Sequence, residues 1–212
     1  MKPYIYIFPV FLFIVLAISN QVYAETASPS DHLYRNVLQT YVEDGLVDYA
    51  GLKSNPEDLK LYLKQTSLVT KENFDKWNKD EQLAFLINIY NAQSLALVIE
   101  NYPVKSIKDI ATDTGGAWKL PIVNLFGERI TLDTLENKVI RTNYPDPRVH
   151  FALVCAALGC PDLINTPYQA EALENQLDQQ TKTFLMDSDK NSIDTEQKIL
   201  MLSPIFDWFK ED

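Results

Sequence analysis

Apolar residues form one long pattern in the middle of this chain. Residues 79–101 are apolar on almost every side, which is typical of a helix buried in a core. Asn88 and Asn91 interrupt the pattern three positions apart, so they lie on one side of the helix. Buried amides need hydrogen-bond partners. Two roles stay open for them: binding a neighbouring backbone loop, or a catalytic role in which they orient an imidazole or donate to a developing oxyanion.

The segments around this helix predict an α+β domain. Gly45 is expected to end the first helix, and Pro56 with the acidic residues after it is a typical helix start. The run 149–156 is almost continuously apolar, which predicts a strand buried on both faces. The other expected helices are one over 33–41, one capped by Thr131 or Asp133, one over 168–185 and a last one from Ser203 to Asp212. The other expected extended segments are residues 46–49, a hairpin of 122–125 with 128–130, and a strand over 199–202. Helices and antiparallel pairs without a repeated βαβ unit indicate helices packed on a small antiparallel sheet.

The first 24 residues have the layout of a secretory signal peptide. Lys2 gives a positive start, residues 4–18 are apolar, and Ala24 closes a short polar region. The apolar run is shorter than the ~20 residues that a spanning helix needs, and Pro9 lies inside it. We therefore expect cleavage after Ala24, a single mature domain over residues 25–212, a periplasmic or secreted location, and no stable membrane insertion of the mature protein.

The charge and the residue types of the chain argue against a nucleic-acid partner and against a metal cofactor. The formal net charge is −10 at pH 7, and the acidic residues are scattered along the chain. Because nucleic-acid binding needs a basic face, we expect no nucleic-acid partner. One histidine and two cysteines lie close together in the sequence, which supplies three ligands where a closed zinc site needs four. No metal or other cofactor is therefore expected, and His32 is expected to be solvated.

The candidate chemistry lies in RVHFALVCAALGCP, residues 148–161, which hold His150 and both cysteines. Cys155 and Cys160 are five apart around a glycine, and in an exported chain this spacing suits a structural disulfide. Alternatively, Cys160 is a thiol nucleophile that His150 activates. A third interpretation makes both cysteines inert and buried. On a regular strand the side chains alternate, so His150 and Cys155 should not meet.

The catalytic interpretation assigns a role to each residue. Cys160 is the nucleophile and His150 is the base. The residue that orients the imidazole is an amide, as in Cys–His–Asn enzymes, or a carboxylate. The candidates for this role are Asn88, Asn91, Glu136 and Asp162.

Four blocks of the chain resemble, in order and spacing, the domain of unknown function 547 family. They are FLINIYNAQSLALVIENYPVKSIKDI, ITLDTLENKVIR, DPRVHFALVCAALGCPDL and LSPIFDWFKED. The resemblance runs from about Asp80 to the C-terminus and assigns no reaction. For the fold it implies kinship with papain-like and transglutaminase-like thiol enzymes, although fold does not fix function. Family members usually continue past the block of residues 208–212, so the resemblance implies a truncated or a naturally short chain.

Two functions are compatible with these observations for an exported domain of unknown reaction. One is a thiol-dependent hydrolase or acyl transferase that acts on a small-molecule or peptide substrate. The other is a non-catalytic binding or scaffold domain, in which a disulfide between Cys155 and Cys160 staples the core.

Overall fold

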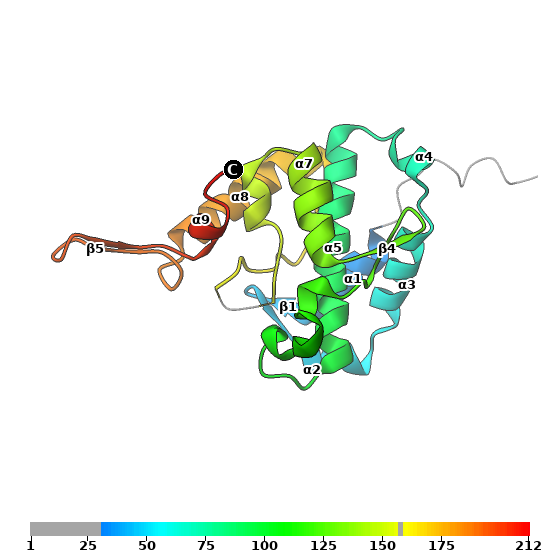
Figure 1. The fold of residues 1–212 in the computed structure, drawn as a ribbon, viewed down its shortest axis with the longest axis horizontal. Helices are drawn as coiled ribbons and strands as arrows, with labels where there is room; N and C mark the ends of the chain where they lie inside the picture. Colours follow the sequence, from blue (N-terminus) through cyan, green and yellow to red (C-terminus); the bar gives the residue numbers. More distant parts are fainter. Residues whose placement is uncertain (1–30, 157–158) are drawn as a thin grey trace, which may run out of the picture.

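A computed structural model describes residues 31–156 and 159–212, and the expected signal peptide lies outside these ranges. Within them the chain is mainly helical with three two-stranded antiparallel hairpins, which confirms the α+β class. The hairpins are separate pairs, so in the described residues no single small sheet supports the helices. Figure 1 shows the helices gathered around α5 (Lys79–Asn101), while β5 (Ser192–Asp194) and β6 (Ile199–Met201) extend away from the body.

Helix α5 is the core of the domain and confirms the sequence prediction. Asn78 and Glu81 form a capping box at its first turn, which satisfies backbone N–H groups that the helix itself leaves unpaired. Almost every side chain from Gln82 to Ile99 is buried. The helix is long and apolar enough to cross a membrane, but 94% of its apolar window is buried inside the protein, as in a core helix.

Between residues 31 and 78, four short helices precede α5 and cover one side of it. They are α1 (His32–Tyr41), α2 (Tyr49–Ser54), α3 (Glu57–Ser67) and α4 (Lys71–Phe74). Tyr34 of α1 and Tyr62 of α3 stack with ring centroids 4.9 Å apart, which joins these two helices. Their apolar faces form a cluster with the C-terminal half of α5, so the N-terminal region and the central helix share one core.

Turns with positive φ close the first two hairpins. The hairpins are β1 (Val42–Glu43) with β2 (Leu46–Val47) and β3 (Val123–Leu125) with β4 (Glu128–Ile130). Phe126 and Gly127 have φ of 54° and 84°, and Asp44 and Gly45 have φ of 48° and 79°. Two successive positive φ values give the turn twist that a two-residue hairpin needs. The hairpin around Phe126–Gly127 is confirmed, whereas Gly45 lies in a turn and α1 already ends at Tyr41.

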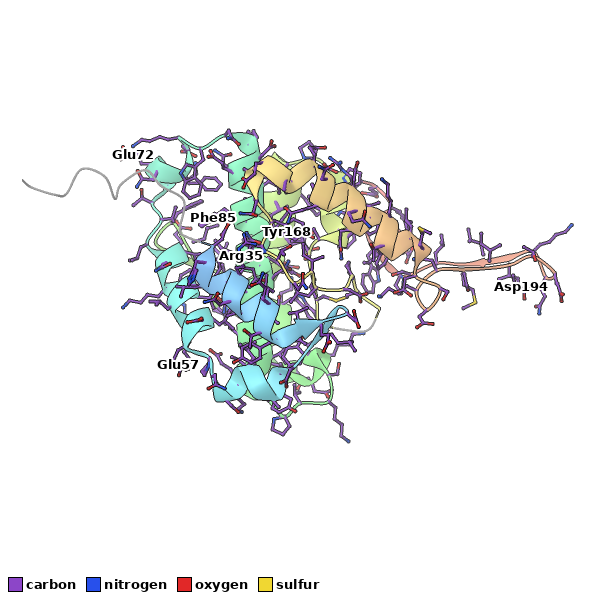
Figure 2. All side chains as sticks on the ribbon, turned by 180° about the vertical axis from the view of Figure 1, so that it is seen from behind. Arg35, Glu57, Glu72, Phe85, Tyr168 and Asp194 are labelled. Carbon is purple, nitrogen blue, oxygen red and sulfur yellow. A yellow bond between two sulfur atoms is a disulfide. The ribbon has the colours of Figure 1, made fainter. Side chains whose placement is uncertain are left out.

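Besides two hairpins, the second half of the chain consists of helical segments, most of them short. They are η1 (Ile107–Asp109), η2 (Thr112–Thr114), η3 (Ala117–Lys119), α6 (Leu132–Thr134), η4 (Leu135–Ile140), α7 (Arg141–Asn143), η5 (Pro147–Phe151), η6 (Ala170–Ala172), α8 (Leu173–Met186) and α9 (Ile205–Trp208). Thr131 caps α6 by accepting from the Thr134 N–H, as expected. Figure 2 shows Phe85 and Tyr168 packed within the body, whereas Asp194 stands at the far end of the β5–β6 arm.

The expected strand over 149–156 is wrong. Asp146 caps a 3₁₀ helix through the Arg148 N–H, Pro147 fills its first turn, and the chain then runs irregularly to Ala156. A short apolar run signals burial but has no period that separates strand from helix. The expected last helix is also shorter, since α9 ends at Trp208 rather than at Asp212.

Candidate functional site

Asn91 of α5 supplies the hydrogen bonds that a neighbouring strand would otherwise supply to the segment after η5. Its Nδ2 donates to the Ala152 carbonyl at 2.9 Å, and its Oδ1 accepts from the Val154 N–H at 2.9 Å. Asn91 is 2% exposed, so both bonds are shielded from water. This pairing allows an irregular apolar segment to be buried without leaving these two backbone groups unpaired.

Asn88 makes the same kind of pair one turn earlier on α5. Its Nδ2 donates to the Tyr168 carbonyl at 2.8 Å, and its Oδ1 accepts from the Tyr168 N–H at 2.9 Å. Both amides therefore bind backbone loops, which is one of the two roles left open by the sequence. Neither amide hydrogen-bonds the His150 imidazole, which it would have to do to orient a catalytic base.

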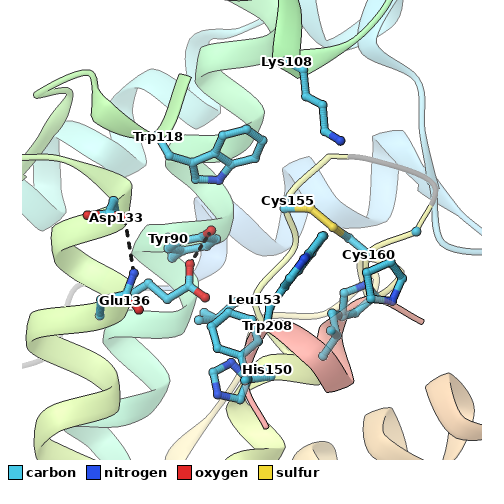
Figure 3. A pocket seen from close by; sticks show the side chains of 16 residues that line it. Tyr90, Lys108, Trp118, Asp133, Glu136, His150, Leu153, Cys155, Cys160 and Trp208 are labelled. Carbon is cyan, nitrogen blue, oxygen red and sulfur yellow. Dashed lines mark hydrogen bonds between the residues drawn. A yellow bond between two sulfur atoms is a disulfide. The ribbon is translucent and has the colours of Figure 1, made fainter. Parts of the chain in front are cut away.

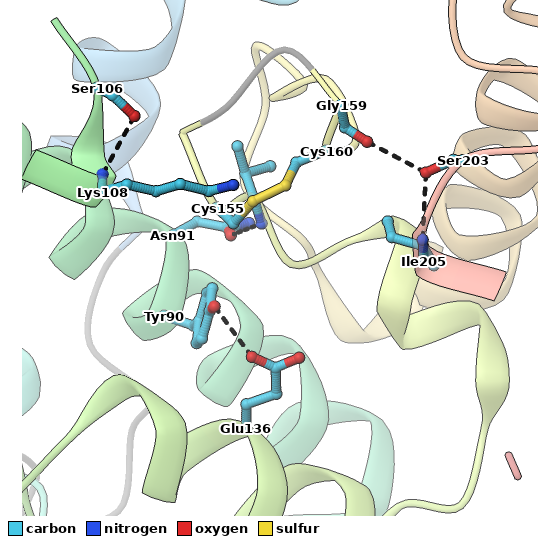
Figure 4. Close-up of a disulfide and its surroundings, with 11 residues drawn as sticks. Tyr90, Asn91, Ser106, Lys108, Glu136, Cys155, Gly159, Cys160, Ser203 and Ile205 are labelled. Carbon is cyan, nitrogen blue, oxygen red and sulfur yellow. Dashed lines mark hydrogen bonds between the residues drawn. A yellow bond between two sulfur atoms is a disulfide. The ribbon is translucent and has the colours of Figure 1, made fainter. Parts of the chain in front are cut away.

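Cys155 and Cys160 form a disulfide (Figure 4), with Cα atoms 5.9 Å apart. This separation lies within the usual range for a bridged pair. Cys160 is buried and Cys155 is partly exposed. The Ser203 hydroxyl donates to the Gly159 carbonyl at 3.2 Å, which ties the bridged segment to the C-terminal part of the chain. In this oxidised form neither sulfur is a thiolate nucleophile.

A cavity of about 460 Å³ opens beside the disulfide (Figure 3). Its walls come from segments far apart in the sequence: Tyr90 of α5, Trp118 of η3, Glu136 of η4, the disulfide, and Trp208 of α9. Because distant segments build it, the cavity exists only in the folded domain. Its aromatic walls and few polar groups are typical of a site for a small ligand.

Glu136 is a partly buried acid in this cavity. It lies on η4, a π-helix, and such wider turns occur frequently at functional sites. Its Oε2 accepts from the Tyr90 hydroxyl at 3.0 Å, and Trp118 lines the same cavity. Burial raises the pKa of Glu136, and the bonds with Tyr90 and the charge of Arg141 only partly oppose this. A carboxyl group perturbed in this way inside a cavity is a candidate functional group.

His150 lies at the same cavity and is held by the C-terminal segment. Its Nε2 lies 2.7 Å from Asp212 Oδ2, and its ring stacks on Phe209 with centroids 3.7 Å apart. A carboxylate only accepts, so Nε2 carries the hydrogen and Nδ1 of the neutral ring is an acceptor. Within the described residues Nδ1 is buried without a hydrogen-bond partner. Arg141 holds Asp212 in turn, through Nε and Nη2 at 2.7 Å each.

The other candidate residues divide between this cavity and other parts of the domain. Asp162, one expected partner of His150, instead pairs with Lys190 at 2.8 Å. Glu136 pairs with Tyr90, so Asp212 is the carboxylate that orients the imidazole. Contrary to the alternation of a regular strand, His150 and both cysteines line one cavity. No hydrogen bond joins the imidazole to either sulfur in the described residues. His32 is exposed at the start of α1.

The described residues contain no group of three or more His, Cys, Asp or Glu side chains placed to hold a metal ion. Asp133 lines the cavity with Glu136, but it pairs with Lys119 at 2.9 Å. The cavity lining presents a carboxyl group at Glu136, an imidazole at His150 and several aromatic rings.

A family model described as "Protein of unknown function, DUF547" matches residues 74–185, more than half of the chain. The chain belongs to the DUF547 family. The match includes α5, Glu136, His150 and the disulfide, while the C-terminal segment that holds His150 lies beyond it. No curated protein and no solved structure matches the chain. The kinship of this DUF547 protein with papain-like and transglutaminase-like enzymes therefore stays an expectation.

Sequence patterns point to only part of the DUF547 cavity. Glu136 stands four positions before Ile140, which places an acid on the apolar side of a predicted helix and marks it as unusual. Tyr90 and Trp208 carry no comparable signal, because an aromatic residue in an apolar pattern usually belongs to the core. Asp212 is 62 positions from His150, so their contact follows only from the tertiary structure.

Replacing His150 with asparagine is expected to remove a pH dependence of stability. Burial lowers the pKa of the folded imidazole below 6.5, against the opposing effect of Asp212. The unfolded chain therefore binds a proton that the folded chain does not, and this stabilisation is complete above pH 6.5 and is lost as the pH falls through the folded pKa. Arg141 holds the pKa of Asp212 at about 2, so this carboxylate stays ionised in that range.

Urea unfolding at a series of pH values measures this effect. The difference in unfolding free energy between the parent protein and His150→Asn should shrink as the pH falls below 6.5. A difference that stays constant with pH would contradict the assigned burial of a neutral imidazole.

Proposed function

We propose that this DUF547 protein is a non-catalytic binding domain, in which the Cys155–Cys160 disulfide fixes one wall of a ligand cavity. The cavity of about 460 Å³ supports this proposal most directly. Its volume lies in the range of small-molecule sites, roughly 300–1,000 Å³. Trp118 and Trp208 offer apolar area, while Glu136 and His150 supply few but specific polar groups. The ligand would be a small molecule or one side chain of a peptide.

We also propose that the domain lies outside the cytoplasm, as a periplasmic or secreted protein. The apolar residues 4–18 and the small residue Ala24 are the features of a cleaved signal peptide. A disulfide persists in oxidising compartments, so the bridged pair fits an exported chain. After cleavage no stable membrane insertion is proposed, and the acidic net charge makes a nucleic-acid partner unfavourable.

Export is tested by mass spectrometry of the protein recovered from the producing cells. The mature chain is expected to begin at Glu25, because cleavage follows the small residue Ala24. Replacing Ala24 with a bulky residue such as phenylalanine should block cleavage and leave the precursor membrane-bound. A parent protein that keeps Met1 and sediments with membranes would show that the N-terminal segment is an anchor.

Binding is tested with N-phenyl-1-naphthylamine, a neutral dye whose fluorescence rises in apolar cavities. The folded protein should bind it, and Trp118→Ala should weaken binding by roughly tenfold through the loss of aromatic contact area. Ile193→Ser on the exposed β5–β6 arm is the control for dye that binds apolar surface outside the cavity, since Ile193 is 73% exposed. Equal dye affinity in parent protein and Trp118→Ala would reject the cavity as the binding site.

A thiol-dependent hydrolase or acyl transferase is the second candidate. It is favoured by one specific observation: His150 is oriented by Asp212 through Nε2 and lines the same cavity as Cys160. A carboxylate that fixes one imidazole nitrogen leaves the other nitrogen to act as a base. In this mechanism an external thiol first reduces the disulfide by thiol–disulfide exchange and is itself oxidised. His150 then accepts the proton of the Cys160 thiol, the thiolate attacks the acyl carbon to form a thioester, and the leaving group departs with that proton. Water or an acceptor nucleophile then takes the acyl group and restores the Cys160 thiol. The thiol measurements in the Discussion distinguish the two candidates.

A further inference from the structure

Three charged residues, Lys108, Asp133 and Glu136, line the cavity, and Glu136 is the one that bonds an aromatic wall residue. Its Oε2 is bonded to Tyr90, and Oε1 has no hydrogen-bond partner among the described residues. Figure 3 shows the carboxylate pointing from η4 toward the space between Tyr90 and the C-terminal segment. A partly buried carboxylate oxygen in this position favours a ligand that brings a positive charge or a hydrogen-bond donor.

Neighbouring charges do not neutralise Glu136. Arg141 is the cation that acts on it from α7, but its guanidinium is bonded to Asp212 at 2.7 Å. Asp133 adds a negative charge and faces Lys119. Lys108 is exposed, and Figure 4 shows its side chain extending toward the disulfide rather than toward Glu136. The end of the cavity at η4 is therefore acidic.

Aromatic rings line the cavity near this acid. Trp118 of η3 is one indole in the lining, and Trp208 of α9 adds a second. Phe209 is already occupied, because its ring stacks on His150 and lies 5.0 Å from the Arg141 guanidinium. The faces of indole rings carry negative electrostatic potential and attract cations within ~6 Å, most strongly where water is excluded.

Resting on the proposed function, we infer that the cavity binds an organic cation: an alkylammonium group carried on an apolar body. Glu136 is the counter-ion, Trp118 and Trp208 are the aromatic walls around the ammonium, and the apolar body lies against the disulfide and α9. An ammonium that is only weakly hydrated, such as a quaternary one, loses least on leaving water and fits best.

The test compares three ligands of similar size on the folded, oxidised protein. Benzyltrimethylammonium is the cation, neopentylbenzene is its neutral carbon isostere, and 3-phenylpropanoate is an anion of similar size. Each displaces N-phenyl-1-naphthylamine, and the cation should bind roughly tenfold more tightly than the isostere. Equal affinity of cation and isostere, or tighter binding of the anion, would overturn the inference while dye binding still supports a ligand cavity.

Charge at residue 136 is tested by Glu136→Gln, which keeps the shape of the side chain. This variant should lose the preference for the cation and still bind the dye. Glu128→Gln, at an exposed acid on β4, is the matched control and should keep the preference. If Glu136→Gln does not fold, Trp118→Leu should instead lower the cation preference by removing the aromatic face. A preference that survives in both variants would show that the cation binds elsewhere.

Discussion

Replacing Asn91 with leucine is expected to cause a large loss of stability. The amide is bonded to the Ala152 carbonyl and the Val154 N–H at 2.9 Å each. Leucine cannot make either bond, so two backbone groups would be left unpaired, at about 1–3 kcal/mol each in the free energy of unfolding. The segment that carries His150 and the disulfide would lose its attachment to α5, so ligand binding should weaken as well.

Urea denaturation of the parent protein and the variant measures this loss. Asn88→Leu should also destabilise strongly, because Asn88 makes the same pair of bonds with Tyr168. Asn101→Leu is the control on the same helix, since Asn101 is exposed. Unfolding midpoints that do not move for Asn91→Leu and Asn88→Leu would mean that water or other groups form hydrogen bonds with the backbone of these loops in the variants.

Removal of the disulfide is expected to lower the free energy of unfolding by about 2 kcal/mol, a value at the lower end because the enclosed loop is short. Cys155→Ala, Cys160→Ala and the double variant should lose similar amounts, because losing either sulfur loses the bond. A double loss equal to the sum of the singles would indicate two independent side chains rather than one bridge.

Thiol chemistry separates the binding domain from the thiol enzyme. The folded, oxidised protein should contain no titratable thiol, since both cysteines are in the disulfide. After reduction, a binding domain should react slowly with iodoacetamide at Cys160, which is 4% exposed. An enzyme should react faster at Cys160 than a free thiol, because a neighbouring imidazolium lowers the pKa of the thiol. Rapid alkylation that disappears in His150→Ala would favour the thiol enzyme.

Local signals in the sequence were sufficient to predict many elements. The apolar pattern of 79–101 gave α5, since a helix covered on all sides needs no polar face. Phe126–Gly127 marked the β3–β4 turn, because its backbone must adopt positive φ. The pairing of Cys155 with Cys160 was among the open interpretations, and their spacing of five residues made that bridge short-range.

Residues 149–156 do not form the strand that their local sequence pattern predicts. Their apolar run indicated burial correctly, but the run packs around α5 without a sheet partner. Asn91 of α5 takes over the hydrogen bonding that a sheet would provide, at Ala152 and Val154, which are 61 and 63 positions away in the chain. No local pattern specifies which distant side chain will pair with a given backbone group.

By itself, the sequence determined the α+β class, the buried central helix with two amides that need hydrogen-bond partners, and the family resemblance. Caps, turns and hydrophobic periodicity act over a few residues, so they can be read without the fold. The tertiary structure alone decided that Asp212, not an amide of α5, holds His150, and that Glu136 meets Tyr90. These contacts depend on how helices far apart in the chain pack, because packing, rather than local preference, brings their side chains together around one cavity.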